Sequence, residues 1–161
     1  QLNILLILTY MSFILKKVES TDLYPLRNKV LRNNKGIQHC KFDGDENEDT
    51  VHFAAIKNQS IIGGVSLINN NTNEVKSLKN IQLRGMAVYR NYQKNKIGSL
   101  LLQKVESYCV KNNIDCIWMN ARLEALKFYL RNDYTKTKKS FNIEGIGKHY
   151  FLYKKLNEKG Y

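Results

Sequence analysis

The sequence lacks the cysteine pattern of a disulfide framework or a structural zinc site. Its three cysteines, Cys40, Cys109 and Cys116, are odd in number and include no Cys-x-x-Cys pair. Disulfide-linked secreted domains and zinc modules both need paired cysteines at short spacings. We therefore predict three reduced, mostly buried thiols, no metal, and a cytoplasmic protein.

A hydrophobic run long enough to cross a membrane is also missing. The apolar stretch QLNILLILTYMSFIL falls short of the roughly 20 apolar residues that a bilayer-spanning helix needs. It has no basic n-region and no small-residue cleavage site, which argues against a secretory signal. We interpret residues 1–12 as an extra N-terminal apolar segment packed against one domain at residues 13–161, and a natural start at Met11 is the alternative.

Acidic residues are scarce, because 14 Asp and Glu face 26 Lys and Arg, which gives a net charge of +12. Such a surplus attracts nucleic acid, acidic membranes or phosphorylated small molecules, although a solvated lysine-rich surface explains it equally well. The basic residues are dispersed and no nucleic-acid motif is visible, so we predict no nucleic-acid partner. The one acidic block, FDGDENEDT at residues 42–50, lacks the ligand order of a calcium loop and is expected to be an exposed loop.

Hydrophobic periodicity predicts strands interspersed with helices. The expected helices cover residues 22–32, 98–112 and 123–131. Strands are expected at residues 13–18, 51–57, 60–68, 81–88, 114–120, 134–141 and 149–156. The single proline, Pro25, falls in the first turn of the first helix, where a missing N–H costs nothing. The order β-α-β-β-β-α-β-α-β-β predicts an α/β (α+β) fold with a mixed, mostly antiparallel sheet flanked by helices.

Glycine is scarce where a phosphate-binding loop would need it. The turn YRNYQKNKIGS follows the strand IQLRGMAV and opens a leucine-rich helix, and its one glycine is Gly98. A helix N-terminus presents unpaired N–H groups and a positive dipole end, which together favour anions. From the residues alone, an ordinary strand-to-helix turn remains the alternative.

The stretch LRGMAVYRNYQKNKIGSLLL resembles the acetyl-CoA-binding segment of the GCN5-related N-acetyltransferase (GNAT) superfamily, whose loop reads Q/R-x-x-G-x-G/A. YPLRNKVLR is similar to the first helix of its small-molecule acetyltransferase branch, and VHFAAIKNQSIIGGVSLI to its second and third strands. NARLEALKFYLRNDY resembles the branch element N-A-R-x-x-A-x-x-F-Y-x-x-x-G-F, and FNIEGIGKHYFLYKKL its closing strands. The resemblance covers about residues 13–156, and implies the acyl-CoA N-acyltransferase (GNAT) fold.

Three positions depart from the family pattern. Lys94 and Lys96 stand where the loop usually has glycine, and Asp133 replaces the glycine of the Y-x-x-x-G-F element. Asp tolerates left-handed backbone better than most residues, so we expect the turn at Asp133 to persist. We expect the amides of the two lysines to face the phosphates while their side chains point outward or reach over the adenosine phosphate.

The resemblance implies an acetyltransferase that uses acetyl-CoA as co-substrate. Met86, Ala87 and Val88 would offer backbone groups to the acetyl and pantetheine part, with the Val88 N–H as oxyanion donor. Asn120 would bond the cofactor arm. The pyrophosphate would be wrapped by the amides of one loop: Gln93, Lys94, Asn95, Lys96, Ile97, Gly98 and Ser99.

The resemblance also implies catalytic residues for direct attack of a neutral amine on the thioester. Tyr129 lies where the family places the acid that protonates the departing thiolate. Glu144 and His149 are candidates for the base, while Arg27 and Arg122 would line the acceptor site and favour an anionic acceptor such as an amino-sugar phosphate. The remaining histidines, His39 and His52, are expected to be structural or solvated.

The leading hypothesis is therefore an acetyl-CoA-dependent N-acetyltransferase of a small-molecule amine, as a monomer or homodimer without a membrane partner. The alternatives are a non-catalytic acyl-CoA-binding or regulatory module of the same fold and, less favoured, a basic nucleic-acid-binding protein.

Overall fold

The computed structural model describes residues 12–156 of the chain. Its strands are β1 (Ile14–Val18), β2 (Val51–Lys57), β3 (Ser60–Ile68), β4 (Asn80–Val88), β5 (Cys116–Arg122), β6 (Thr135–Ile143) and β7 (Gly147–Lys155). Its α-helices are α2 (Tyr24–Leu31), α3 (Ile97–Lys111) and α4 (Leu126–Arg131). The 3-10 turns are η1 (Ser20–Leu23), η2 (Ile37–His39), η3 (Arg90–Tyr92) and η4 (Leu123–Ala125). The predicted element order is confirmed, while the proposed N-terminal segment lies outside the described residues except for Ser12.

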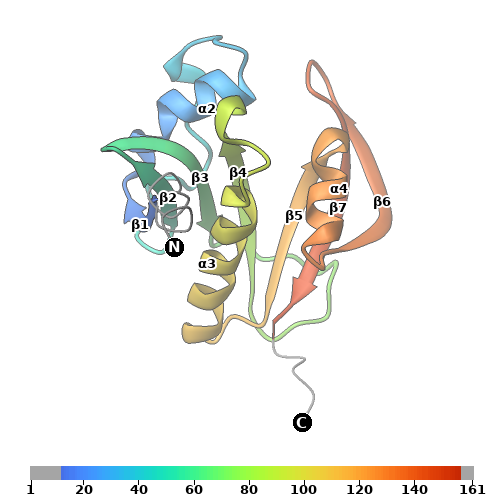
Figure 1. The fold of residues 1–161 in the computed structure, drawn as a ribbon. Helices are drawn as coiled ribbons and strands as arrows, with labels where there is room; N and C mark the ends of the chain where they lie inside the picture. The colour runs from blue at the N-terminus through green and yellow to red at the C-terminus, as the bar shows by residue number, and fades with distance from the viewer. Residues whose placement is uncertain (1–11, 157–161) are drawn as a thin grey trace, which may run out of the picture.

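The strands form one seven-stranded sheet in the order β1-β2-β3-β4-β5-β7-β6. Every neighbouring pair is antiparallel except β4 and β5, which are parallel. The predicted mixed, mostly antiparallel sheet is therefore confirmed. The parallel pairing is short, because it runs only from Asn80↔Cys116 to Gln82↔Trp118. Beyond it the two strands diverge, and the halves β1–β4 and β5–β7 separate toward the top of Figure 1.

The helices cover both faces of the sheet, as the alternation of side chains along β2 shows. Phe53 and Ala55 pack in the large core together with residues of α3 and α4. Ala54, between them, packs on the opposite face against Leu23 and Leu26 from η1 and α2. Gly64 permits this close approach, because a Cβ there would lie 2.5 Å from a methyl carbon of Leu23.

Two predicted boundaries shifted for local reasons. The first helix begins as the 3-10 turn η1 and becomes α-helical only at Tyr24, with Pro25 in the first turn as predicted. The strand expected from residue 114 begins at Cys116, since the Ile114 N–H donates to the Cys109 carbonyl at 2.9 Å and so belongs to the end of α3.

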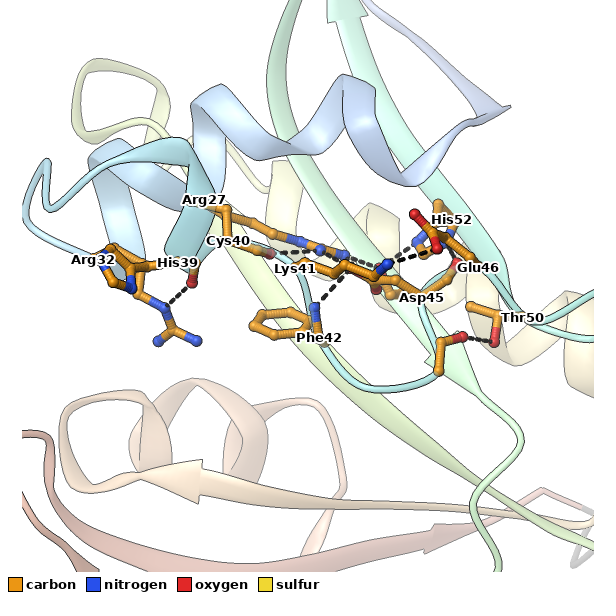
Figure 2. Close-up of polar contacts among 12 residues, drawn as sticks. Arg27, Arg32, His39, Cys40, Lys41, Phe42, Asp45, Glu46, Thr50 and His52 are labelled. Carbon is orange, nitrogen blue, oxygen red and sulfur yellow. Dashed lines mark hydrogen bonds and ion pairs between the residues drawn. The ribbon is translucent and has the colours of Figure 1, made fainter.

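A buried polar network anchors residues 37–50 over the sheet (Figure 2). The Arg27 guanidinium is 1% exposed and forms a two-pronged ion pair with Asp45. It also donates to the Cys40 carbonyl at 2.9 Å and to Ser66 Oγ at 2.8 Å. His52 completes the network through Ser66 Oγ and the Asp45 carbonyl, so its predicted structural role is confirmed.

This network corrects the prediction that residues 42–50 form a wholly exposed loop. Phe42 and Asp45 are buried, and the Phe42 N–H donates to the Asp45 carboxylate at 2.9 Å. Polar composition suggested exposure, but a carboxylate can be buried when a guanidinium and a backbone amide satisfy it.

We predict that Asp45→Ala lowers the free energy of unfolding by about 3–5 kcal/mol, because it leaves the buried Arg27 charge without its partner. Urea unfolding measures this change. Glu46→Ala is the matched control: Glu46 is exposed, pairs with Lys41 at the surface, and should change stability by no more than about 0.5 kcal/mol. Equal effects of the two substitutions would contradict the proposed anchoring role.

The three cysteines are free and buried, which confirms the prediction from their number and spacing. Burial raises the pKa of Cys109 to about 12 and that of Cys116 to about 11, and it also raises the pKa of Cys40. A raised pKa keeps a thiol protonated, whereas the thiolate is the reactive form.

We therefore predict that a disulfide reagent such as DTNB finds almost no reactive thiol in the folded protein at pH 8. All three cysteines should react in denaturant. Rapid reaction of any of them under native conditions would show that the surrounding core opens readily.

Within residues 12–156, no helix is long and apolar enough to cross a membrane.

Candidate active site

A pocket of about 240 Å³ lies where β4 and β5 diverge. Its lining residues come from the end of α2, both diverging strands, α4 and the β6–β7 hairpin, and include Arg84, Met86, Asn120, Arg122, Tyr129 and His149. A larger hollow of about 490 Å³ beside residues 45–50 touches none of the predicted site residues. The pocket between the diverging strands is therefore the candidate active site.

The strand β4 carries a bulge at Gly85 that shapes one wall of the pocket. Ser66 pairs with Arg84 and Gly64 with Ala87, so β4 has one residue more than β3 across this interval. Gly85 has φ +65°, and a Cβ there would lie 2.6 Å from the Phe42 ring. A bulge of this kind bends the strand and redirects its side chains.

The backbone of β4 faces the opening between the strands at its end. The Tyr89 N–H donates to the Ile62 carbonyl on the β3 side. Because successive residues of a strand direct their backbone groups to opposite sides, the N–H and C=O of Val88 face away from β3. The Gln93 side chain donates to this Val88 carbonyl at 3.1 Å. Met86 lines the pocket, so the predicted cofactor-binding strand lies at its edge.

The predicted phosphate loop presents a row of unpartnered amides. Within residues 12–156, the N–H groups from Lys94 to Ser99 make no hydrogen bond, and the first helical bond of α3 runs from Leu100 to the Lys96 carbonyl. The side chains of Gln93, Lys94 and Asn95 are exposed. Six consecutive free donors at the N-terminus of a fifteen-residue helix are suited to bind a polyanion.

The two lysines in this loop adopt the backbone conformation that the family pattern assigns to glycine. Lys94 has φ +63° and Lys96 has φ +62°, both in the left-handed region. Asp133 likewise has φ +66°, and the turn after α4 persists, as predicted. The loop shape is therefore kept at a conformational cost that glycine would avoid.

Gly98 allows the first turn of α3 to pack closely on α4. A Cβ at Gly98 would lie 3.0 Å from two carbons of the Phe128 ring in α4. Ile97 is buried beneath the loop and approaches the backbone of β3 at Gly63. The first turn of α3 thus contacts elements from both halves of the sheet.

Tyr129 lines the pocket and is 6% exposed. Its ring packs edge-to-face on Phe128 and Tyr134, with centroids 5.0 Å and 5.7 Å away. Its hydroxyl makes no hydrogen bond within the described residues, and burial raises its pKa above the ordinary value of 10.0. The hydroxyl is therefore a proton-bearing group without a protein partner.

The two base candidates occupy different environments. His149 lines the pocket, is 5% exposed, and stacks on Phe141. Its Nδ1 lies 2.9 Å from the Gly147 carbonyl, an acceptor, so Nδ1 carries the proton and Nε2 of a neutral ring is left as an acceptor. Glu144 lies exposed in the β6–β7 turn and does not line the pocket.

Of the two arginines predicted for the acceptor site, only Arg122 lines the pocket, where it donates to the Leu31 carbonyl at 3.1 Å. The structure places Arg27 in the core, contrary to the prediction, because its charge is neutralised by Asp45. Sequence reasoning missed Arg32, Arg84 and Phe42, which also line the pocket. Arg84, Gly85 and Met86 are all half-buried, so no simple alternation along the strand marked Arg84 in the sequence.

Asn120 is exposed and lines the pocket on β5, two residues beyond the last parallel pair with β4. No group of three His, Cys, Asp or Glu residues that could hold a metal ion occurs among the described residues.

Comparisons with known proteins agree with this geometry. A profile of the Acetyltransferase (GNAT) family matches residues 18–134. The uncharacterized N-acetyltransferase YitI of Bacillus subtilis (strain 168) is 28% identical over 141 residues, covering 88% of this chain and 95% of the relative. An aminoglycoside 6'-N-acetyltransferase complexed with coenzyme A has a similar fold, with a TM-score of 0.73, 12% identity, and coverage of 92% of this chain and 99% of that one. A GNAT-family acetyltransferase from Staphylococcus aureus Mu50 gives a TM-score of 0.70 at 23% identity, covering 90% and 99% of the two chains. The chain belongs to the GNAT family of acetyltransferases.

Proposed function

We propose that this acetyl-CoA-dependent N-acetyltransferase transfers the acetyl group to the primary amine of a small molecule by direct attack. The observation that carries the proposal is the combination of two features. A row of free amides from Lys94 to Ser99 opens α3, and a pocket with the unpartnered hydroxyl of Tyr129 lies between the diverging strands. The free amides can bind the phosphates of acetyl-CoA, and the pocket with its hydroxyl can hold the thioester and the acceptor amine.

Each step of the reaction can be assigned to a group of this chain. The amides of residues 94–99 hold the pyrophosphate, and Met86 to Val88 offer backbone groups to the pantetheine arm. His149 Nε2 accepts a proton from the acceptor ammonium, directly or through water, and the free amine then attacks the thioester carbonyl. The Val88 N–H stabilises the developing oxyanion. A new C–N bond forms and the C–S bond breaks, while the Tyr129 hydroxyl donates its proton to the departing sulfur. The attacking nitrogen loses its second proton as it becomes an amide, and this proton returns through water to the Tyr129 oxygen.

Several sequence-based expectations stay predictions. These are the anionic character of the acceptor, the cofactor contact of Asn120, a base role for Glu144, a cytoplasmic location and a monomeric or homodimeric state. The position of His149 makes it the preferred base, since it lines the same pocket as Tyr129.

The first test addresses the phosphate loop. Gly98→Val should weaken acetyl-CoA binding, because its added carbons meet the Phe128 ring and displace the first turn of α3. Lys94→Gly and Lys96→Gly should leave the affinity nearly unchanged, because the amides do the binding. Each should also raise the free energy of unfolding by up to about 1 kcal/mol, since glycine relieves the left-handed backbone.

Isothermal titration with acetyl-CoA and urea unfolding measure these effects. Large loss of affinity in both glycine variants would mean that the lysine side chains, and not the backbone, hold the phosphates. Tighter binding would show that the lysines obstruct the site.

The second test addresses Tyr129. Tyr129→Phe should lower kcat for thiol release by about 10²–10⁴-fold, the usual contribution of one proton donor. The Kd of acetyl-CoA should stay unchanged, since the ring and its packing remain. Because burial raises the pKa of Tyr129, the wild-type hydroxyl keeps its proton throughout the pH range below 10.

Tyr153→Phe, in β7 and outside the pocket, serves as the matched control. Unchanged turnover of Tyr129→Phe would remove the proposed role of this hydroxyl. Acetyl-CoA binding without thiol release from the unmutated protein, over a broad panel of amines, would favour the non-catalytic acyl-CoA-binding module.

A further inference from the structure

Three arginines from three separate elements converge on the pocket. Arg32 follows α2, Arg84 lies on β4 and Arg122 ends β5, and all three line the pocket together with Phe42. No Asp or Glu is among the lining residues. Burial lowers the pKa of Arg84 and of Arg122, and the positive charge of Arg32 contributes in both cases. The pocket is thus a partly desolvated site with three like charges.

None of the three guanidinium groups has an ion-pair partner within residues 12–156. Arg32 donates from Nε to the His39 carbonyl at 2.8 Å, and Arg122 donates to the Leu31 carbonyl. The Arg84 guanidinium makes no hydrogen bond in the described part of the chain. Most of their N–H donors therefore remain available.

The nearby carboxylates do not neutralise this cluster. Asp43 and Asp45 act on Arg84 through their charge, and Glu124 acts on Arg122. However, Asp45 is already bound to Arg27, while Asp43 and Glu124 are exposed and do not line the pocket. Of these four arginines, only Arg27 forms an ion pair with a carboxylate within residues 12–156.

Phe42 holds two of the arginines in place. The Cζ atoms of Arg84 and Arg32 lie 4.7 Å and 5.5 Å from the centroid of its ring. A guanidinium that lies over an aromatic ring keeps its N–H edge free for hydrogen bonds in its own plane. Phe42 is itself fixed by the buried network of Arg27 and Asp45, which bonds its backbone N–H (Figure 2). The charged groups are therefore preorganised before any ligand binds.

Resting on the proposed function, we propose that Arg32, Arg84 and Arg122 form an anion subsite of the acceptor pocket. The acceptor is then a small primary amine that also carries a carboxylate or a phosphate. Its anionic group lies near Phe42, while its amine lies toward His149 and Tyr129 on the same pocket. A neutral acceptor would leave the three guanidinium charges without compensation, which disfavours its binding.

Matched acceptors that differ only in the anionic group test this proposal through thiol release. The phosphate arm compares O-phosphoethanolamine with ethanolamine and glucosamine 6-phosphate with glucosamine. The carboxylate arm compares β-alanine with its amide. We expect kcat/KM to favour the anionic member in at least one arm by about 10–100-fold, which is the usual worth of one or two charged hydrogen bonds. The arm with the larger preference identifies the anion. Equal values within every pair would overturn the proposal.

Substitutions of Arg84 test whether the preference for an anionic acceptor comes from this arginine cluster. Arg84→Gln should lower kcat/KM for the preferred anionic acceptor by about 10–100-fold and change the value for its neutral partner little. Arg84→Lys should recover part of the lost activity, because lysine restores the positive charge but not the paired N–H donors of the guanidinium. Arg131→Gln, an exposed arginine of α4 outside the pocket, should behave as wild type. Equal loss for both acceptors, or a weaker Kd for acetyl-CoA, would overturn the proposal and assign Arg84 to folding or to the cofactor.

A binding measurement separates failure of the subsite from failure of the proposed function. Titration of the CoA-bound protein with O-phosphoethanolamine and with β-alanine requires no turnover. Binding that Arg84→Gln abolishes would support the subsite even if no amine released thiol. Thiol release with neutral amines alone, together with no binding of either anion, would overturn the subsite and leave the acetyltransferase activity in place.

Discussion

The short parallel pairing of β4 and β5 is the constraint on which the rest of the site depends. Three residue pairs join the two halves of the sheet, and then the strands diverge. This leaves one edge of β4 without a partner strand, and it opens the pocket between the halves. The bulge at Gly85 occurs just beyond the last β4–β5 residue pair and bends β4 at this point. Contacts elsewhere must hold the halves together, and the seating of Gly98 of α3 against Phe128 of α4 is one of them.

The charged groups beside the pocket depend on a buried ion pair in the core. Arg27 and Asp45 neutralise each other in the core, and a buried pair of this kind stabilises mainly by fixing geometry, since its desolvation offsets much of its attraction. The Arg27–Asp45 pair fixes the position of Phe42, because the Phe42 N–H donates to the Asp45 carboxylate. Phe42 in turn orients Arg84 and Arg32 beside the pocket. One neutralised arginine in the core thus positions others whose charges remain available.

The sequence predicted the element order well because alternation and helical spacing reflect local burial, as in VHFAAIK and SIIGGVSLI. It predicted the free amides at the start of α3 because helix termini expose their N–H groups wherever they occur. It failed where burial depends on distant partners. Asp45 looked exposed within FDGDENEDT, and Arg27 was assigned to the acceptor site, because nothing local shows that the two meet across 18 positions. Arg84 was missed because its role depends on the bulge beside it and on Phe42, both of which are tertiary features.

The two substrates are therefore expected to be recognised by different kinds of groups. In the proposed cofactor site the binding groups are backbone amides, so lysines can occupy the two glycine positions provided that they adopt positive φ. In the proposed acceptor pocket the binding groups are side chains, and each of the arginines comes from a different element. A substitution in the loop has to preserve only backbone shape, whereas a substitution in the pocket changes charge directly. Under this proposal, acceptor choice can change between related chains while the cofactor site keeps its function, and the arginines of the pocket are the residues expected to determine acceptor specificity.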